Sequence, residues 1–282
     1  MREPDLRLGL IGDNIARSRS PLLHRLAGEQ QGMFVTYDRL IPRDLGQDFD
    51  AVFEQCRTAG YRGINITYPY KEIVARKVVV DDPLVRGIGA VNTVIFDEGG
   101  PHGHNTDYSG FVAAIRNARP GKAPGRVCMI GTGGVGRAIA FGLVALDADA
   151  IRLIDRDRAK AEALAGDLRG AAPGLDIAVF NFAEEAATGA DGVINCTPVG
   201  MVGYDGTPLE RASMAGCGWA FDAVYTPADT QFLGDAAAKG LDVISGYELF
   251  FYQGVHAWRF FHGSPLDEAR LRAGLLAEGD VL

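Results

Sequence analysis

The chain has 282 residues, a formal net charge of −8 and 47% hydrophobic residues, which is typical of a globular protein with one large domain or two ordinary ones. This acidic balance, without any cluster of lysine and arginine, argues against nucleic acid as a partner. The chain opens without a signal-peptide pattern, and no apolar run approaches the roughly 20 residues that a membrane helix needs. We therefore expect a cytoplasmic protein that does not bind membranes.

Strand-like and helix-like segments alternate through the first hundred residues. The expected strands are 6–12, 34–40, 63–67 and two within 89–106, and the expected helices are 20–32 and 49–60. In the first helix we expect Ser20 to be the N-cap and Pro21 to be the first helical residue. A further helix is expected at 107–118. Alternation of this kind indicates an α/β sheet.

A glycine-rich motif follows the Pro/Gly-rich break at 119–125. The apolar strand VCMI runs directly into Gly131, Gly133, Gly134 and Gly136, and an apolar helix comes next. Glycines at such a turn allow backbone N–H groups to approach a pyrophosphate closely, and the helix N-terminus favours its negative charge. An acidic residue ends the following strand, about 20 residues further on, as the dinucleotide-binding pattern requires. The motif therefore predicts a dinucleotide-binding domain.

The acidic residue of this pattern, Asp155, bears on which dinucleotide binds. Its carboxylate can accept hydrogen bonds from the free ribose hydroxyls of NAD, and it would repel the 2′-phosphate of NADP. Arg156 and Arg158 follow, and an arginine can accommodate that phosphate. The pattern favours NAD and leaves NADP as the alternative.

The remainder of the chain contains further strands and a long aromatic helix. The strands are expected at 176–180, 192–197, 219–225 and 241–245, and the helix at 248–263. Apolar residues occupy most of the surface of this helix, so we expect its aromatic residues Phe250, Phe251, Trp258 and Phe261 to belong to the core. Gln253 is the polar exception.

Polar side chains gather near the expected strand ends of the first half. Ser18 and Ser20 precede a helix N-terminus, where hydroxyls and free N–H groups suit a carboxylate. The other polar residues of this kind are Asn65, Thr67, Lys71, Asn92, Asn105, Thr106 and Asp107. Each alone is a common turn or cap residue, but together they fall in loops expected to line a cleft. Because nothing near His102 and His104 completes a ligand set, we expect no metal site.

The motifs SRSPLLH, GINITYPYK, GAVNT, GHNTDYSG, GTGGVGRA, NCTPVGM, DAVYTP and YQGVHAW occur in this order over nearly the whole chain. In this combination they resemble the shikimate dehydrogenase family, including its quinate/shikimate branch. The resemblance implies two α/β domains with a cleft between them. A substrate domain at 1–108 would be completed by C-terminal helices at 248–282, and a Rossmann-type domain would occupy 109–247.

The resemblance also implies a reaction and a set of residues for it. The reaction is the NAD-linked interconversion of shikimate and 3-dehydroshikimate, with quinate as a further substrate. Lys71 and Asp107 match the catalytic pair of the family, in which a positioned lysine can take the proton that leaves when a hydride moves to nicotinamide. Substrate contacts are implied at Ser18, Ser20, Asn65, Thr67, Asn92, Tyr225 and Gln253. Cofactor contacts are implied at Gly131, Gly133, Gly134, Val135, Gly136, Asp155, Arg156, Thr197 and Gly246.

Several positions depart from the family pattern. Arg17 stands where many members have histidine, and Arg25 stands where asparagine is usual. Asp155 resembles the NAD-using quinate/shikimate branch, whereas Ser20 fits the shikimate-preferring pattern. Alternatives therefore remain: a dehydrogenase of an amino analogue such as aminoshikimate, a non-catalytic dinucleotide sensor, or a folate-type dehydrogenase. In each enzymatic case the partner is a small molecule. For a shikimate or quinate/shikimate dehydrogenase it is a polyhydroxylated cyclohexene or cyclohexane carboxylate. We expect the protein to be a monomer or a homodimer.

Overall fold

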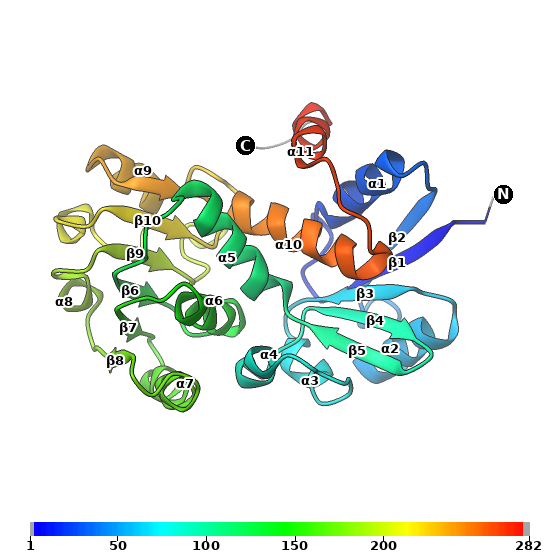
Figure 1. Cartoon of the computed structure of the whole chain (residues 1–282), viewed down its shortest axis with the longest axis horizontal. Helices are drawn as coiled ribbons and strands as arrows, with labels where there is room; N and C mark the ends of the chain where they lie inside the picture. Colours follow the sequence, from blue (N-terminus) through cyan, green and yellow to red (C-terminus); the bar gives the residue numbers. More distant parts are fainter. Residues whose placement is uncertain (1–2, 279–282) are drawn as a thin grey trace. The chain divides into compact units, whose positions relative to one another are not determined.

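The structure is a computed structural model, and it describes residues 3–278. The described residues form two compact units. Residues 3–106 together with 253–278 form the N-terminal unit, and residues 107–252 form the C-terminal unit. Both contain a sheet with helices (Figure 1), so the expected α/β class is confirmed.

The N-terminal unit is built on a five-stranded sheet with the order β2-β1-β3-β4-β5. Its strands are β1 (Leu6–Ile11), β2 (Val35–Leu40), β3 (Gly63–Ile66), β4 (Thr93–Asp97) and β5 (Gly100–His104). The first three strands are parallel, and β4 and β5 are antiparallel to their neighbours. Its helices are α1 (Ser20–Gln30), α2 (Phe49–Thr58), α3 (Lys71–Val74), α4 (Pro83–Ile88) and α11 (Glu268–Ala277), with the second half of α10 (Gly246–His262).

Apolar residues cover both faces of this sheet. On one face Ile64 and Ile66 of β3 pack with Phe49 and Phe53 of α2. On the other face residues of β1 and β2 pack with Trp258 and Phe261 of α10. Gly63 belongs to this second face, since a Cβ there would lie 2.6 Å from Phe261. Alternation along β3 therefore sends its isoleucines to one side and Asn65 to the other.

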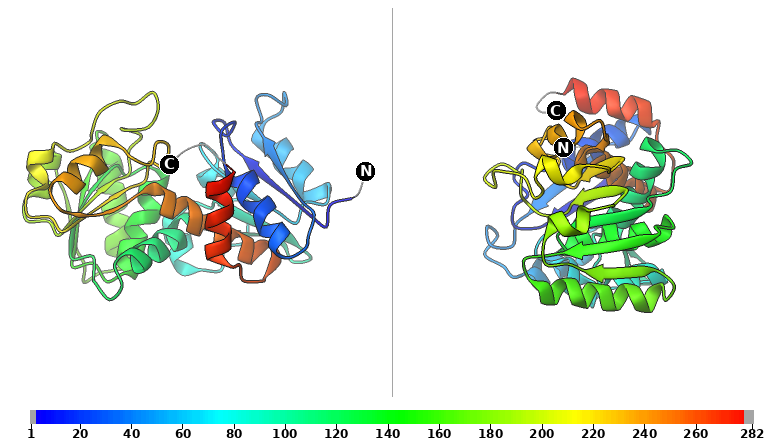
Figure 2. Two further views of the ribbon diagram at one scale, coloured as in Figure 1. Left: turned by 90° about the horizontal axis from the view of Figure 1, so that it is seen from above. Right: turned by 90° about the vertical axis from the view of Figure 1, so that its left-hand side faces the viewer.

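The start of α1 differs from the expectation. Ser20 is already helical, and Arg19 occupies the N-cap without a capping side chain. The backbone N–H of Ser20 donates instead to the hydroxyl of Ser18 at 3.3 Å. The helix therefore begins one residue earlier than predicted, because Ser18 and not Ser20 accepts an N–H of its first turn. Figure 2 shows α11 lying beside this helix, and Arg19 donates to the carbonyl of Leu275 at 2.5 Å.

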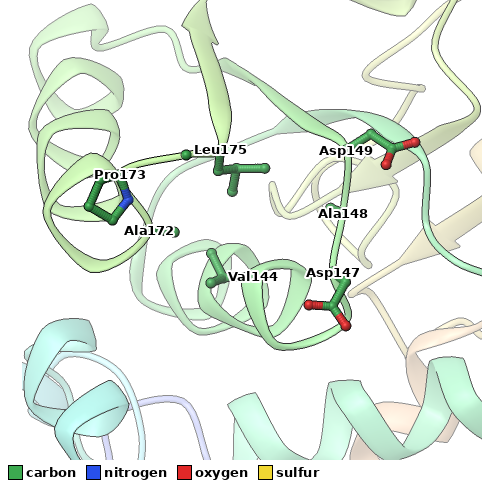
Figure 3. A pocket seen from close by; sticks show the side chains of 8 residues that line it. Val144, Asp147, Ala148, Asp149, Ala172, Pro173 and Leu175 are labelled. Atoms are coloured by element: carbon green, nitrogen blue, oxygen red, sulfur yellow. The ribbon is translucent and has the colours of Figure 1, made fainter.

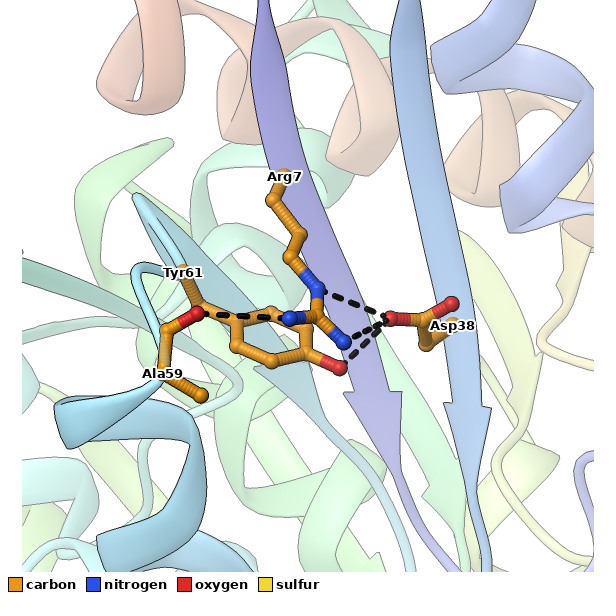
Figure 4. A network of polar contacts seen from close by, with 4 residues as sticks. All are labelled: Arg7, Asp38, Ala59 and Tyr61. Atoms are coloured by element: carbon orange, nitrogen blue, oxygen red, sulfur yellow. Dashed lines mark hydrogen bonds and ion pairs between the residues drawn. The ribbon is translucent and has the colours of Figure 1, made fainter. Parts of the chain in front are cut away.

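An ion-pair network joins the amino-terminal part of the same sheet (Figure 4). Arg7 of β1 donates to Asp38 of β2 through Nε and Nη2 at 3.3 and 3.2 Å. The hydroxyl of Tyr61 donates to the same carboxylate oxygen at 2.5 Å. The guanidinium also lies 4.1 Å from the centre of the Tyr61 ring. We expect this network to stabilise the pairing of β1 with β2.

The C-terminal unit is built on a six-stranded parallel sheet, whose strands follow one another in the right-hand view of Figure 2. Its strands are β6 (Arg126–Ile130), β7 (Ala150–Ile154), β8 (Asp176–Val179), β9 (Gly192–Asn195), β10 (Trp219–Asp222) and β11 (Asp242–Ile244). Its helices are α5 (Thr106–Ala118), α6 (Gly134–Ala145), α7 (Arg158–Ala171), α8 (Ala183–Ala187), the 3-10 helix η1 (Arg211–Met214) and α9 (Gln231–Ala238), with the first half of α10.

The strand order of this sheet is β8-β7-β6-β9-β10-β11, which is the order of a Rossmann fold. The expected Rossmann-type fold in this part of the chain is thereby confirmed. The aromatic residues of α10 are also buried as expected, with Phe250, Phe251, Trp258 and Phe261 at most 3% exposed. Among residues 3–278, none of the helices has both the length and the apolar character needed to cross a bilayer.

Candidate active site

The topology of the N-terminal unit brings the polar loops to one edge of its sheet. The carboxyl ends of parallel β1 and β3 meet where Ile11 pairs with Ile66. The loop after β1 carries the two serines, and the turn after β3 carries Thr67 and leads into Lys71. Because β4 is antiparallel to β3, its first residue, Thr93, lies beside Asn65 at this same edge.

The two serines contact each other. The hydroxyl of Ser18 donates to the hydroxyl of Ser20 at 3.2 Å, and both residues are half-buried. Arg39 of β2 fixes the loop from outside by donating to the backbone carbonyl of Ser18 at 2.7 Å. This arrangement presents two hydroxyls close to the start of a helix, which suits a carboxylate ligand.

Asn92 is a buried side chain, 3% exposed, that ties the start of β4 to the end of β5. Its Oδ1 accepts the backbone N–H of Thr106 at 2.7 Å and the hydroxyl of Thr93 at 3.1 Å. Its Nδ2 makes no hydrogen bond to any residue in the described part of the chain. This donor is therefore available to a ligand.

Lys71 and Asp107 occupy the starts of two helices. Lys71 is half-buried and begins α3, and its carbonyl accepts the N–H of Val91 at 3.0 Å. Asp107 is 3% exposed and lies in the first turn of α5, directly after Thr106. Both side chains thus project from the first turn of a helix that follows a sheet strand.

The glycine loop follows β6 and opens α6. Gly131 has a φ of 98°, which favours glycine, and a Cβ at Gly136 would lie 2.3 Å from the carbonyl of Gly131. At Gly133 and Gly134, by contrast, a Cβ would meet no atom of the described residues within 4 Å. Backbone conformation and packing therefore explain Gly131 and Gly136, but they do not explain Gly133 and Gly134. Room for the close approach of a dinucleotide explains Gly133 and Gly134, so the loop fits this cofactor.

Asp155 lies just after β7, and both of its carboxylate oxygens accept hydrogen bonds. Thr132 donates to Oδ2 through its backbone N–H and its hydroxyl, at 2.8 and 2.9 Å, and the N–H of Asp157 donates to Oδ1 at 2.9 Å. Partial burial raises the pKa of Asp155, but these hydrogen bonds outweigh it and hold the pKa below its usual value. The carboxylate is therefore charged at neutral pH.

The two arginines that follow differ in their surroundings. Arg156 is exposed. Arg158 donates to Asn181 at 2.5 Å and pairs with Glu162 at 2.7 Å. These contacts direct the guanidinium of Arg158 toward α7 and the segment after β8.

A buried network that the sequence reasoning missed joins the carboxyl ends of β9 and β10. Asn195 donates to Asp222 at 2.9 Å and accepts the hydroxyl of Thr197 at 2.7 Å. Asp222 also accepts the hydroxyl of Thr230 at 2.6 Å. Burial raises the pKa of Asp222 to about 6 against the effect of these hydrogen bonds. The sequence contains one sign of this network: each of these two apolar strands ends in a polar residue, Asn195 in β9 and Asp222 in β10.

The remaining predicted residues lie around α10. Tyr225 is half-buried, and its ring stacks on Phe250 with 5.3 Å between centroids. A Cβ at Gly246 would lie 2.5 Å from the carbonyl of Val224, so close packing alone requires glycine there. Gln253 is half-buried, and it lies in the half of α10 that belongs to the N-terminal unit.

A hollow of about 380 Å³ lies elsewhere in the C-terminal unit (Figure 3). It is lined by Val144, Asp147, Asp149 and Leu175 among others. Asp149 and Leu175 directly precede β7 and β8, so the hollow lies at the amino ends of these strands. The glycine loop follows the carboxyl end of β6, at the opposite edge of the parallel sheet. The hollow is therefore not the dinucleotide site.

Comparison with known proteins agrees with this architecture. The model of the shikimate dehydrogenase substrate-binding domain matches residues 10–94, and a model described as NADP oxidoreductase, coenzyme F420-dependent, matches residues 126–203. The chain is 37% identical to the shikimate dehydrogenase (NADP(+)) of Pseudarthrobacter chlorophenolicus, covering 95% of this chain and 94% of that one. It is 36% identical to the quinate/shikimate dehydrogenase (NAD(+)) of Corynebacterium efficiens, covering 98% and 100%.

A solved structure shares the whole fold as well. The quinate dehydrogenase of Corynebacterium glutamicum in complex with NAD superposes with a TM-score of 0.91 at 34% identity, covering 96% of this chain and 99% of that one. The fold and the glycine loop define an NAD(P)-dependent dehydrogenase. The chain belongs to the shikimate dehydrogenase family, in which the curated relatives include both NADP- and NAD-dependent enzymes.

Proposed function

We propose that this protein oxidises shikimate to 3-dehydroshikimate, and reduces it in reverse, with NAD as its preferred cofactor. The observation that carries the proposal is the set of polar groups at one edge of the N-terminal sheet. The hydroxyls of Ser18 and Ser20 suit a carboxylate, and the available Nδ2 of Asn92 suits a ring hydroxyl. Lys71 follows β3 at the same edge.

Each of these residues has a part in the proposed reaction. Ser18 and Ser20 bind the substrate carboxylate, with Tyr225 beside it, while Thr67, Asn92 and Gln253 bind ring hydroxyls. Lys71 takes the proton from the hydroxyl that is oxidised and returns it in the reverse direction. Asp107 hydrogen-bonds the lysine and a neighbouring hydroxyl. NAD, when bound at the glycine loop, supplies the hydride acceptor.

The choice of NAD rests on Asp155. Its carboxylate is charged and sits after β7, where an acidic residue of this fold meets the ribose hydroxyls. A phosphate at the ribose 2′-oxygen would be repelled by it. Exposed Arg156 offers a single compensating charge. Quinate is a second candidate substrate, because the NAD-bound Corynebacterium relative is a quinate dehydrogenase.

The experiment that tests the catalytic assignment replaces Lys71 by alanine. We expect kcat for shikimate oxidation to fall by about 10²–10⁴-fold, as the loss of a general base does, while NAD affinity stays unchanged. Lys77→Ala is the matched control, since Lys77 follows α3 and pairs with Asp50 at 3.0 Å. A Lys71→Ala enzyme as active as the Lys77→Ala enzyme would contradict the proposal.

A further inference from the structure

Asn65 has both donor hydrogens of its side-chain amide used by the protein. Its Oδ1 accepts the phenol hydroxyl of Tyr37 at 2.8 Å, and the imidazole of His24 lies beside this side chain. Its Nδ2 donates to the hydroxyl of Thr93 at 3.0 Å and to the carbonyl of Asn92 at 3.3 Å. A side-chain amide has two donor hydrogens and two acceptor lone pairs. Both donor hydrogens and one lone pair of Asn65 are engaged, whereas Nδ2 of Asn92 has no partner among residues 3–278.

His24 is held in place by rings. It is 1% exposed, and it stacks on Tyr37 with 5.0 Å between centroids and 8° between planes. Phe261 meets it edge-on at 5.4 Å. Burial lowers the pKa of His24 to about 3, so the imidazole is neutral and carries one N–H. Its Nδ1 has no partner among residues 3–278, so Nε2 is the nitrogen through which His24 can interact with Asn65.

Tyr37 connects the two ends of the candidate site. Its phenol hydroxyl donates to Asn65 at 2.8 Å, and Ser20 lies beside the same phenol group. Ser20 in turn is joined to Ser18 by the hydroxyl pair at 3.2 Å. The serines of the proposed carboxylate site and the asparagine beside β4 therefore share one phenol group, which comes from the middle of β2.

We propose that Tyr37 and His24 are positioning residues of this site, which hold Ser20 and Asn65 in place, and that Asn65 links parts of the site without touching the substrate. The inference rests on the proposed function. In the bound complex the substrate carboxylate would meet hydroxyls that Tyr37 has already oriented, so less rotamer freedom is lost on binding. The neutral imidazole of His24 adds a second donor that fixes the orientation of the Asn65 amide.

Tyr37→Phe tests the inference, because it removes one oxygen and keeps the ring that stacks on His24. We expect KM for shikimate to rise about tenfold while kcat and KM for NAD stay within about twofold, since the lost contact acts on substrate binding alone. Tyr61→Phe is the control. It removes a phenol hydrogen bond to Asp38 in the same unit, away from the serines, and should leave KM for shikimate unchanged.

The outcomes separate this inference from the proposed function. Normal turnover with the same shikimate KM in Tyr37→Phe and Tyr61→Phe overturns the inference and leaves the proposed function standing. If the wild type binds shikimate in calorimetry but does not oxidise it, the proposed function fails, and the affinities of the two variants still decide the inference. A wild type that neither binds nor oxidises shikimate overturns both.

A second pair of variants covers the case in which Tyr37→Phe does not fold. His24→Gln keeps an N–H donor directed at Asn65, whereas His24→Leu removes it. We expect KM for shikimate to stay closer to the wild-type value in His24→Gln. Equal shikimate KM in the two variants, at equal thermal stability, would overturn the role assigned to His24.

Discussion

His24 is a neutral imidazole in the interior of the N-terminal unit, and this has a consequence for stability. Burial lowers its pKa from 6.5 to about 3. Between these values the unfolded chain binds a proton that the folded chain does not. Lowering the pH through this window therefore favours unfolding, by up to about 1.4 kcal/mol per pH unit for one proton.

We predict that His24→Gln reduces this loss of stability, measured by urea unfolding at a series of pH values between about 4 and 7. Asp222 acts with the opposite sign, because its raised pKa of about 6 makes stability fall as the pH rises from about 4 to 6. That effect is common to the wild type and the variant, so it cancels in their difference. A difference that does not change with pH would contradict the neutral state of His24.

Asp155 carries the prediction on cofactor choice. Asp155→Asn removes the charge and keeps an oxygen for the hydrogen bonds from Thr132. We expect the ratio of kcat/KM with NAD to kcat/KM with NADP to fall about tenfold or more, which corresponds to about 1.4 kcal/mol. Asp157→Asn, in the same loop, is the matched control. If both variants shift the ratio equally, general electrostatics and not the position of Asp155 decides the preference.

At the residue level the sequence predicts which positions are polar but not how each is used. The resemblance implied the same role for Asn65 and Asn92. Their difference depends on Tyr37, which is 28 positions from Asn65 in the chain. A sequence pattern shows neighbours along the chain, whereas hydrogen-bond capacity is used up by neighbours in space.

Most strands, and the helices expected at 20–32, 49–60, 107–118 and 248–263, were predictable because their apolar patterns match the strand and helix periods. The strand expected at 63–67 is β3, Gly63–Ile66, and the two strands expected within 89–106 are β4 and β5, of which β5 was indicated by the Gly-Gly turn at its start and not by an apolar pattern. Helices α4, α7, α8 and α9 were not anticipated, and of these α4 and α8 have only six and five residues and cannot display a helical period. The N-cap of α1 was misplaced because two serines near one helix start offer equivalent signals.

The start of α6 allows a prediction that separates packing from cofactor binding. Gly133→Ala places a Cβ where the described residues leave 4 Å free, at an ordinary φ of −70°. We expect an unchanged thermal midpoint without cofactor and at least about tenfold weaker NAD binding, because the Cβ obstructs the approach of the pyrophosphate. Thermal unfolding with and without NAD measures both effects.

Gly136→Ala is the contrasting variant, because its Cβ would lie 2.3 Å from a backbone carbonyl. It should lower the thermal midpoint even without NAD. If Gly133→Ala is stabilised by NAD as strongly as the wild type is, the glycine loop does not hold the pyrophosphate as proposed.

The N-terminal unit consists of two separate stretches of the chain. Residues 253–278 return to it, and Trp258 and Phe261 fill one face of its sheet. A chain that ends at Tyr252 would leave this face uncovered. We predict that this shortened chain loses hydrogen-exchange protection in β1 to β5, while its C-terminal unit still binds NAD.

A chain that ends at Gly263 is the control, since it keeps both aromatic residues and lacks only α11 and the segments around it. It should retain protection in β1 and β3. Equal protection of these strands in the chain that ends at Tyr252 would show that the N-terminal unit folds without α10. The sequence resemblance implied this return of the chain, but the face that it covers depends on the register of β3.

The most direct test of the proposed function is a comparison of initial rates by the absorbance of reduced nicotinamide, with NAD or NADP against shikimate or quinate. The charged Asp155 and the paired serines predict the highest kcat/KM for NAD with shikimate. A higher value with NADP would contradict the assignment of Asp155. The absence of turnover with all four pairs, in protein whose thermal midpoint NAD raises, would contradict the proposed reaction itself.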